Sequence, residues 1–462
     1  MHLRAAFAAV VAASLGAVSL QAAEPAPVPV SRCLPAAAVV PATDSTGPVR
    51  TFRYDEEYPA MAYSAAALAN PVARLQERLA RGAQELTFAG RRGYLDSLLE
   101  ALGIDPSSQL LVYSKSSLQK ALISPARPRA LYFNDSTYVG WVQDSDQLEV
   151  ATVDCDKGPV FYVFSNRPAD TPPFRRETTR CLTCHDTVGL LGGGIPAFTV
   201  YSMPVDGDGG VFVNDNPVAV SDATPLAQRW AGWYVTGQHG GQVHLGNRSA
   251  ATERQFREAD PKGGSNRDSV GGFIDVRPYR TDKSDIVALL VFEHQAAVQT
   301  HLSRALFKSR EFLAREAPRD GIDAPLGALS PRMRGLYKRL LEPVVRSMLF
   351  VDAVSLTDRI RSSSGFPAWF EAQGPRDAKG RSLRELDLKT RLFRYPLSYV
   401  IYTEAFDGLP RSAREYIYAR LHDVLAGKET DAVFAHLDGQ DRQALLEILM
   451  ATKPEFAEWA AS

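Results

Sequence analysis

The sequence predicts an α+β protein, in which a small antiparallel sheet region precedes a loop-rich region and an all-helical C-terminal region. Two patterns carry this prediction. Between residues 129 and 165, short aromatic and β-branched runs alternate with Asn, Asp and Gly, a pattern typical of hairpins. From residue 284 onward, apolar residues recur at helical spacing. With 462 residues, 45% of them hydrophobic and 23% charged, the chain has ordinary globular composition and room for two or three domains.

The N-terminus has the pattern of an export signal. A basic start, "MHLR", is followed by the apolar run "AAFAAVVAASLGAVSL" and by small residues before Glu24. We therefore predict a signal peptide over residues 1–23, cleaved near Ala22 or Ala23, and an exported protein that is periplasmic or secreted. The alternative, a buried helix, is disfavoured because no polar face interrupts the run. No later run is long and apolar enough to predict a stable membrane span.

A Pro- and Ala-rich linker over residues 24–50 leads into an N-terminal α+β region, residues 51–170. Apolar residues at helical spacing predict helices in "NPVARLQERLARG", which Gly82 can end, and in "GYLDSLLEALGI". The period then changes to that of strands. The predicted strands lie in "RALYFNDSTYVGWVQ", "QLEVATVD" and "GPVFYVFS".

A C-x-x-C-H motif follows the predicted sheet, formed by Cys181, Cys184 and His185 in "RCLTCHDTVGLLGGGIP". One turn of backbone with this spacing presents both thiols to the edge of a porphyrin, with the histidine beneath it as axial ligand. A redox-active disulfide has no need of that histidine, and a zinc site would need a second ligand pair that the sequence lacks. We predict one covalent haem c, bound by Cys181 and Cys184, with His185 on the iron.

The stretch "CLTCH" with the following "GLLGGGIP" resembles c-type cytochromes. The whole chain is also similar to a group of large bacterial single-haem proteins described only as cytochrome c domain-containing. The resemblance to c-type cytochromes covers only the motif and its immediate surroundings, a small part of the chain. It implies a haem and no particular reaction.

Two cysteines remain outside the motif, Cys33 and Cys155. In an oxidising compartment two remaining thiols most simply pair with each other. We therefore predict a disulfide between them.

Residues 171–283 form the predicted haem c-binding, loop-rich region. It is rich in Gly, Asp, Asn and Pro, but it holds too many aromatic residues to be disordered. We expect loops packed around the haem. Its aromatic residues Trp230, Trp233 and Tyr234 either cover the porphyrin or belong to the core, and the sequence leaves both possibilities open.

Residues 284–462 form the predicted helical region. Its first helix is capped at Ser284, although "IVALLVF" alone could also be a buried strand. In the second, "MRGLYKRLLEPVVRSMLF", Pro343 is expected to bend the helix. A third helix ends at Gly427, and a fourth opens at Asp438 and stops before Pro454.

The second axial position of the iron distinguishes an electron carrier from an enzyme, because a carrier fills it with a strong ligand. The sequence offers five candidates: Met203, His239, His244, His294 and His301. We rank His294 and His239 first as metal ligands. His294 follows an apolar run, so that a buried ring would need a partner, and glycines flank His239 and permit close approach to a flat cofactor. Met203 is expected to be a buried gap-filler and His301 an ordinary helix residue.

The formal net charge of −1 provides no global field that would favour a nucleic-acid partner. We predict one-electron transfer through haem iron, with a redox partner protein or a small-molecule electron donor or acceptor. The alternative is a haem c oxidoreductase that uses peroxide or oxygen on a bound substrate, and a sensor or docking module is a third class. The sequence decides neither whether the protein is an enzyme nor its oligomeric state.

Overall fold

The computed structural model describes residues 53–64, 67–169, 174–186, 194–212, 217–317 and 321–462. The chain divides between residues 31 and 32, and all of the described residues belong to the second part, residues 32–462. The predicted signal peptide and the linker lie outside the described residues. So does Cys33, and with it the predicted disulfide; Cys155 itself is buried.

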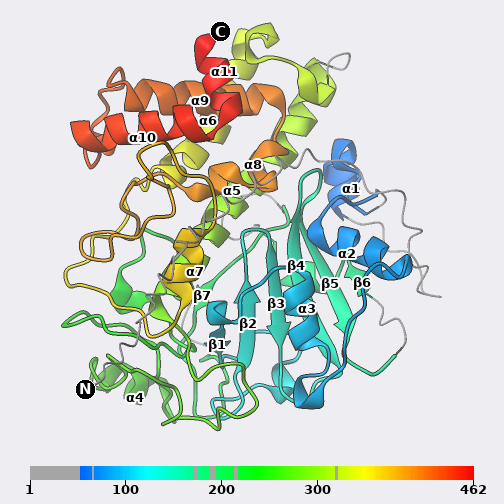
Figure 1. Ribbon diagram of the computed structural model, residues 1–462, viewed down its shortest axis with the longest axis vertical. Helices are drawn as coiled ribbons and strands as arrows, with labels where there is room; N and C mark the ends of the chain where they lie inside the picture. Colours follow the sequence, from blue (N-terminus) through cyan, green and yellow to red (C-terminus); the bar gives the residue numbers. More distant parts are fainter. Residues whose placement is uncertain (1–52, 65–66, 170–173, 187–193, 213–216, 318–320) are drawn as a thin grey trace, which may run out of the picture. The chain divides into compact units, whose positions relative to one another are not determined.

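A six-stranded sheet lies in the lower part of the molecule in Figure 1, below the C-terminal helices, with its strands antiparallel and in chain order. The strands are β1 (Leu110–Val112), β2 (Arg129–Phe133), β3 (Thr137–Trp141), β4 (Gln147–Asp154), β5 (Gly158–Ser165) and β6 (Phe174–Glu177). The sequence predicted β2 to β5. It missed both edge strands, because a run of three or four residues carries little periodicity of its own.

One face of the sheet is covered by two of the predicted helices, α2 (Pro71–Ala80) and α3 (Leu95–Ala101). Asn70 caps α2, since its side-chain oxygen accepts a hydrogen bond from the Ala73 amide at 2.9 Å. Gly82 follows the end of α2 with φ at +65°, which is the role the sequence predicted for it. A five-residue helix, α1 (Arg53–Glu57), precedes them.

The opposite face is covered by α5 (Ile286–Glu316), a helix of 31 residues. The run "IVALLVF" is therefore helical, which resolves the strand alternative. Asp285 caps the helix through the Val287 amide at 2.8 Å, and the prediction of Ser284 is wrong by one residue. The Ser284 hydroxyl instead donates to the Tyr234 carbonyl at 2.6 Å.

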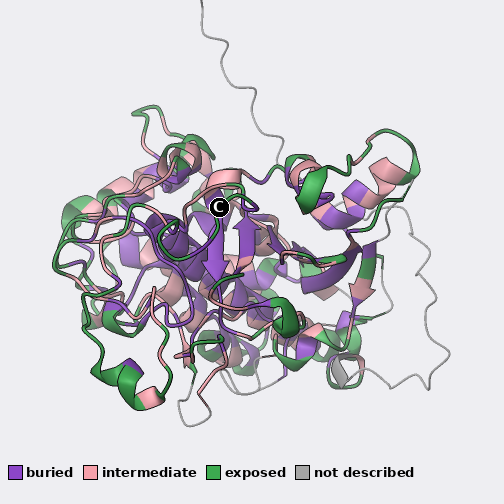
Figure 2. Cartoon of the chain, turned by 90° about the horizontal axis from the view of Figure 1, so that it is seen from below, coloured by how far each residue is buried: buried purple, intermediate pink, exposed green. Residues whose placement is uncertain are grey.

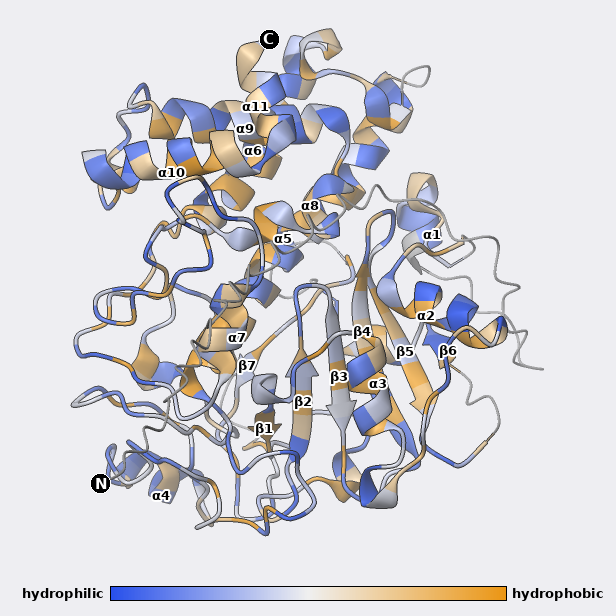
Figure 3. Ribbon diagram, in the orientation of Figure 1, coloured by the Kyte–Doolittle hydropathy of each residue, from blue (hydrophilic) through white to orange (hydrophobic). Residues whose placement is uncertain are grey.

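The C-terminal region is helical, and the α+β class is confirmed. Asp438 caps its helix through the Asp441 amide at 2.8 Å, as predicted. Pro343 lies inside α6, and Gly427 follows α9 with φ at +73°. The helices are α6 (Pro331–Met348), α7 (Phe366–Ala372), α8 (Glu404–Asp407), α9 (Arg411–Leu425), α10 (Gly439–Thr452) and α11 (Pro454–Ala461). Figure 3 shows hydrophobic and hydrophilic residues alternating along several of these helices.

Loops nevertheless occupy much of the chain outside these elements. Residues 349–398 contain α7 and otherwise run as loops, so this part of the C-terminal region departs from an all-helical one. The described residues between 174 and 283 contain β6, the short pair β7 (Tyr201–Ser202) and β8 (Val218–Ala219), and α4 (Glu253–Glu258). Figure 2 shows that buried residues gather in the sheet and its neighbouring segments, with exposed residues at the periphery.

Candidate functional site

The C-x-x-C-H motif folds as a single turn. Residues Cys181–Thr183 form a 3₁₀ turn, and the amides of Cys184 and His185 both donate to the Cys181 carbonyl, at 3.2 and 3.0 Å. Cys181 is partly buried against the core and Cys184 is exposed. The local geometry thus brings both thiols and the imidazole onto one turn, which is the arrangement the sequence predicted.

The two ring nitrogens of His185 have different surroundings. Nδ1 lies 3.2 Å from the carbonyl oxygen of Ala197, and since a carbonyl only accepts, Nδ1 carries the proton. Nε2 is then the nitrogen with the lone pair, and no described residue is hydrogen-bonded to it. Histidines that bind metals in proteins commonly donate their other nitrogen to such a carbonyl, which orients the ring. The ring also packs on Phe161, with centroids 4.8 Å apart.

Helix α5 fixes the position of the Ala197 carbonyl. The Ser303 hydroxyl donates to the Pro196 carbonyl at 2.6 Å, and the Thr300 hydroxyl donates to the Phe198 carbonyl at 2.8 Å. The Ala197 amide in turn donates to the His185 carbonyl at 3.0 Å. The segment 196–198 is therefore held on one side by α5 and on the other by the motif. A backbone carbonyl has no signature of its own in the sequence, which is why sequence analysis missed Ala197.

Burial sets the protonation states of the motif. It lowers the pKa of His185 to about 4, with the charge of Arg129 acting in the same direction, so the ring is neutral near pH 7. Burial, followed by the charge of Glu177, raises the pKa of Cys181 to about 12. Reactive disulfide exchange requires a thiolate. The surroundings of Cys181 therefore favour a neutral thiol and disfavour a disulfide oxidoreductase.

His294, the first-ranked candidate for the second axial ligand, is held elsewhere. Its Nδ1 lies 2.8 Å from a carboxylate oxygen of Asp222, and its Nε2 lies 2.7 Å from the hydroxyl of Ser398. The ring is buried and stacks on Phe350 at 4.3 Å between centroids. The sequence was right that this imidazole is buried and needs a partner. Because protein groups occupy both nitrogens, the geometry argues against His294 as an iron ligand.

The chain Asp222–His294–Ser398 has the connectivity of a hydrolase triad. A nucleophile must reach its substrate, however, and Ser398 is 0% exposed. Its hydroxyl also accepts a hydrogen bond from the Val400 amide at 3.3 Å, which caps the short 3₁₀ turn that follows. These contacts make the three residues a structural link between α5 and two loops.

His239, the second-ranked candidate, lies near the start of α5. The Ile286 amide donates to the Thr236 carbonyl at 2.8 Å, whereas the His185 segment is held at Thr300. Fourteen residues of α-helix separate these two levels by roughly 20 Å. That separation argues against His239 and His185 as ligands of one iron.

The positions of the ring protons are a second argument against His239, and they also argue against His244, as iron ligands. The Asn266 amide donates to Nε2 of His239 at 3.2 Å, and the Gly246 amide donates to Nδ1 of His244 at 3.0 Å. Both rings are buried, with centroids 4.8 Å apart. An amide can only donate, so the protons lie on the opposite nitrogens, which have no partner among the described residues. A nitrogen that carries a proton cannot bind a metal, and His239 and His244 are therefore poor candidates in this arrangement.

Met203 departs from its predicted role. It is only partly buried and belongs to neither core cluster, so it is not a buried gap-filler. Burial and then the neighbouring Cys184 raise the pKa of Tyr201, which places Tyr201 beside the motif. Met203 follows two residues later in the chain, directly after β7. His301 lies on α5 and is partly buried.

The aromatic residues of the loop region are buried and hydrogen-bonded within the protein. Trp230 donates to Glu293 at 2.7 Å, and Trp233 donates to the Tyr201 carbonyl at 2.8 Å. The Tyr234 hydroxyl donates to the Pro125 carbonyl at 2.8 Å. Of the two possibilities that the sequence left open, these contacts favour core aromatics.

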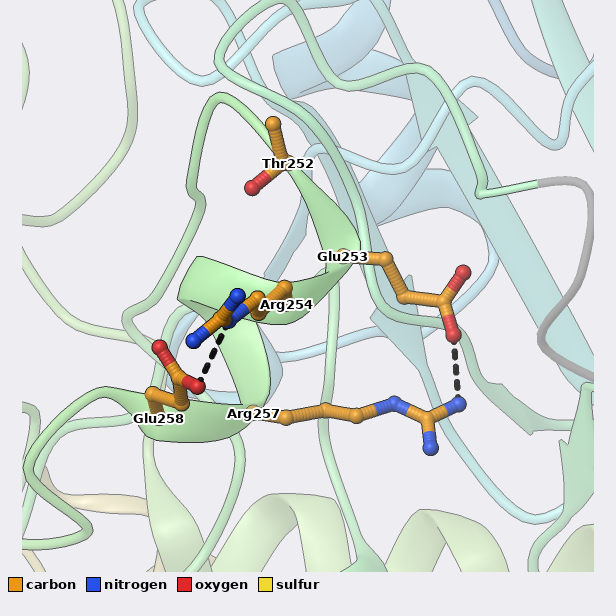
Figure 4. A pocket seen from close by; sticks show the side chains of 5 residues that line it. All are labelled: Thr252, Glu253, Arg254, Arg257 and Glu258. Atoms are coloured by element: carbon orange, nitrogen blue, oxygen red, sulfur yellow. Dashed lines mark hydrogen bonds and ion pairs between the residues drawn. The ribbon is translucent and has the colours of Figure 1, made fainter.

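The rest of the described chain offers fewer features that indicate a functional site. In the part of the chain that the structure describes, no three His, Cys, Asp or Glu side chains form a group that could hold a metal ion. A surface hollow beside α4 is lined by Thr252 and by two pairs of opposite charge, Glu253 with Arg257 and Arg254 with Glu258 (Figure 4). Both are pairs within one helical turn, which typically contribute little. No helix among the described residues has the length and apolar character to span a membrane.

No protein-family model, curated protein or solved structure matches the chain. The functional interpretation therefore depends on the geometry of the site itself.

Proposed function

We propose that this protein is an exported c-type haem protein that transfers single electrons. Cys181 and Cys184 would hold one haem through thioether bonds, and Nε2 of His185 would bind the iron. The observation that supports this proposal is the orientation of His185, whose Nδ1 donates to the Ala197 carbonyl while Nε2 has no partner among the described residues. Bound haem iron would supply the one-electron chemistry.

The donor set suits that group. The porphyrin supplies four ligands itself, so the chain needs to offer one axial imidazole and two thiols on a single turn. The neutral state of His185 near pH 7 is the state that binds iron. The Ala197 carbonyl orients the ring and makes it more basic, and Phe161 restricts its rotation. The electron donor or acceptor would be a redox protein or a small molecule in the periplasm or outside the cell.

Covalent attachment is tested by expressing the full chain in an export-competent host that has the haem attachment machinery. We expect the intact mass of the mature protein to include one haem, and the haem to resist extraction with acidic acetone. The double variant Cys181→Ala/Cys184→Ala should lose the added mass. Thr183→Ala is the matched control, because Thr183 is exposed and lies between the two cysteines without being part of C-x-x-C-H. A wild-type mass without haem, or covalent haem in the double variant, would contradict the proposal.

A haem oxidoreductase that uses peroxide or oxygen is the second candidate. The observation that favours it is that His294 and His239, the expected sources of a strong second ligand, are placed elsewhere. Electron paramagnetic resonance of the resting ferric protein separates the two candidates. A low-spin iron that binds cyanide slowly supports the carrier, and a high-spin iron that binds cyanide rapidly supports the oxidoreductase.

A further inference from the structure

A partly buried ion pair lies on the sheet face next to the candidate iron ligand. Arg129 and Glu149 are 2.6 Å apart, and their side chains are 21% and 15% exposed. In the register of β4 and β5, Ala151 faces Phe161 and Glu149 faces the next residue on that side of β5, Val163. Glu149 is thus the diagonal neighbour of Phe161, and such residues typically lie about 7–8 Å apart, with their Cβ atoms somewhat closer. Since the Phe161 ring packs on His185, the pair is close to the site.

The pair is held in place by its neighbours. Gly140 pairs with Glu149 across β3 and β4, and a Cβ atom added to it would meet the Arg129 guanidinium at 2.5 Å. A glycine at this position therefore lets Arg129 lie across the sheet. The Ser117 hydroxyl donates to Glu149 at 2.9 Å and fixes the carboxylate. Nε of Arg129 is buried and has no partner among the described residues.

Both charges act on the motif, and they act in opposite directions. Arg129 lowers the pKa of His185, whereas Glu149 raises it. The same two residues also act on Cys181, again with opposite signs. Charges in a partly buried site are screened less than charges in water, so the pair remains effective at the distance of the imidazole.

We propose that the Arg129–Glu149 pair sets the electron affinity of the iron that His185 would hold. This inference rests on the proposed function. Ferric iron carries one more positive charge than ferrous iron, so the Glu149 carboxylate stabilises the oxidised state and the Arg129 guanidinium stabilises the reduced state. The two residues touch neither substrate nor iron in this role. They act through the field at the site.

A potentiometric titration of the purified full-length haem protein tests the pair. Glu149→Gln removes the negative charge and should move the midpoint potential to more positive values. Arg129→Gln should move it to more negative values, and Arg129→Lys, which keeps the charge, should stay close to the wild type. The matched controls are Arg391→Gln and Asp441→Asn, which break an ion pair of the same 2.6 Å length in the C-terminal region and should leave the potential unchanged.

Opposite shifts for Glu149→Gln and Arg129→Gln would support the inference, whereas shifts of equal sign, or shifts no larger than those of the controls, would overturn it. If the wild-type protein contains no haem, both the proposed function and this inference are wrong. If haem is bound but the midpoint potentials of the variants equal that of the wild type, only this inference is wrong. Should Arg129→Gln fail to fold, Gly140→Ala supplies the same test, because its Cβ displaces Arg129. It should shift the potential in the same direction by a smaller amount, and no shift would again overturn the inference.

Discussion

Two histidines beside helix α5 show what distinguishes a ligand from a structural residue. His185 is held near the Thr300 level of the helix, and His294 is part of the helix itself. His294 is buried, and His185 is partly buried. His294 has a protein partner on each nitrogen, whereas His185 has one on Nδ1 alone. Burial shows only that an imidazole needs partners. The state of the second nitrogen shows whether a metal can be one of them.

The surroundings of the two rings differ in the same way. Next to His294, Glu293 accepts hydrogen bonds from Arg229 at 2.9 Å and from Trp230 at 2.7 Å, and all of these side chains are buried. The groups of this polar network are buried and bonded to one another. Around His185, by contrast, the motif places the exposed Cys184 at the protein surface. The first region has the features of a structural core and the second those of a site that remains open to a cofactor.

The largest expected effect is on stability, at His294. Replacing it with alanine leaves Asp222 and Ser398 without their hydrogen-bond partner and opens a cavity beside Phe350, which should lower the free energy of unfolding by ~3–5 kcal/mol. His185→Ala in the haem-free protein removes one hydrogen bond to a carbonyl and the ring contact with Phe161, and should cost about 1–2 kcal/mol. Urea denaturation of both variants measures the difference. Equal losses would show that the two histidines play the same structural role.

Local patterns explain which parts of the fold the sequence predicted. The strands β2 to β5 and the helices α2 and α3 each carry their own periodicity, and Asp438 carries its own capping signal. The start of α5 was misplaced because Ser284 and Asp285 can both cap a helix. Contacts distant in sequence decide between them, since Ser284 is engaged by Leu111 and Tyr234.

In the candidate site, too, the sequence predicted the residues that are neighbours in the chain and missed the contacts between distant ones. Cys181, Cys184 and His185 are neighbours in sequence, so their spacing was informative. The partners of His294 are 72 and 104 residues away from it in sequence, and no pattern in one sequence connects them. Phe161 likewise reaches His185 only through the pairing of the strands. What the sequence could not supply is therefore the identity of partners that tertiary structure brings together.

An intermediate effect is expected in the pH dependence of stability, through Glu293. Burial raises the pKa of Glu293 to about 7, and the charge of Asp222 adds to this, although Arg229 opposes it. Between about pH 4.3, the usual pKa of an unfolded glutamate, and pH 7, the folded state binds more protons than the unfolded one. The contribution of Glu293 to stability is thus complete below this window and is lost as the pH rises through it.

In Glu293→Gln, the side chain at position 293 does not titrate between about pH 4.3 and pH 7. The free energy of unfolding of this variant should fall less between pH 5 and pH 7.5 than that of the wild type, by about 2 kcal/mol. Urea denaturation at several pH values measures both slopes. Parallel slopes would show that Glu293 remains ionised throughout, held by Arg229, and that the network next to His294 does not titrate in this range.

The smallest effect on stability is expected at Met203, where the effect on the iron should be clear. Met203 lies outside both core clusters, so Met203→Ala should change the free energy of unfolding by less than about 0.5 kcal/mol. Among the sequence candidates for the second axial ligand, Met203 lies two residues from Tyr201, which is beside the motif. We expect the ferric iron to change from low-spin to high-spin in this variant, measured by electron paramagnetic resonance.

Met450→Ala is the matched control, because Met450 is 44% exposed on α10 and should change neither stability nor spin state. A low-spin spectrum that persists in Met203→Ala would move the ligand to another residue, and a wild-type protein that is already high-spin would favour the oxidoreductase over the carrier.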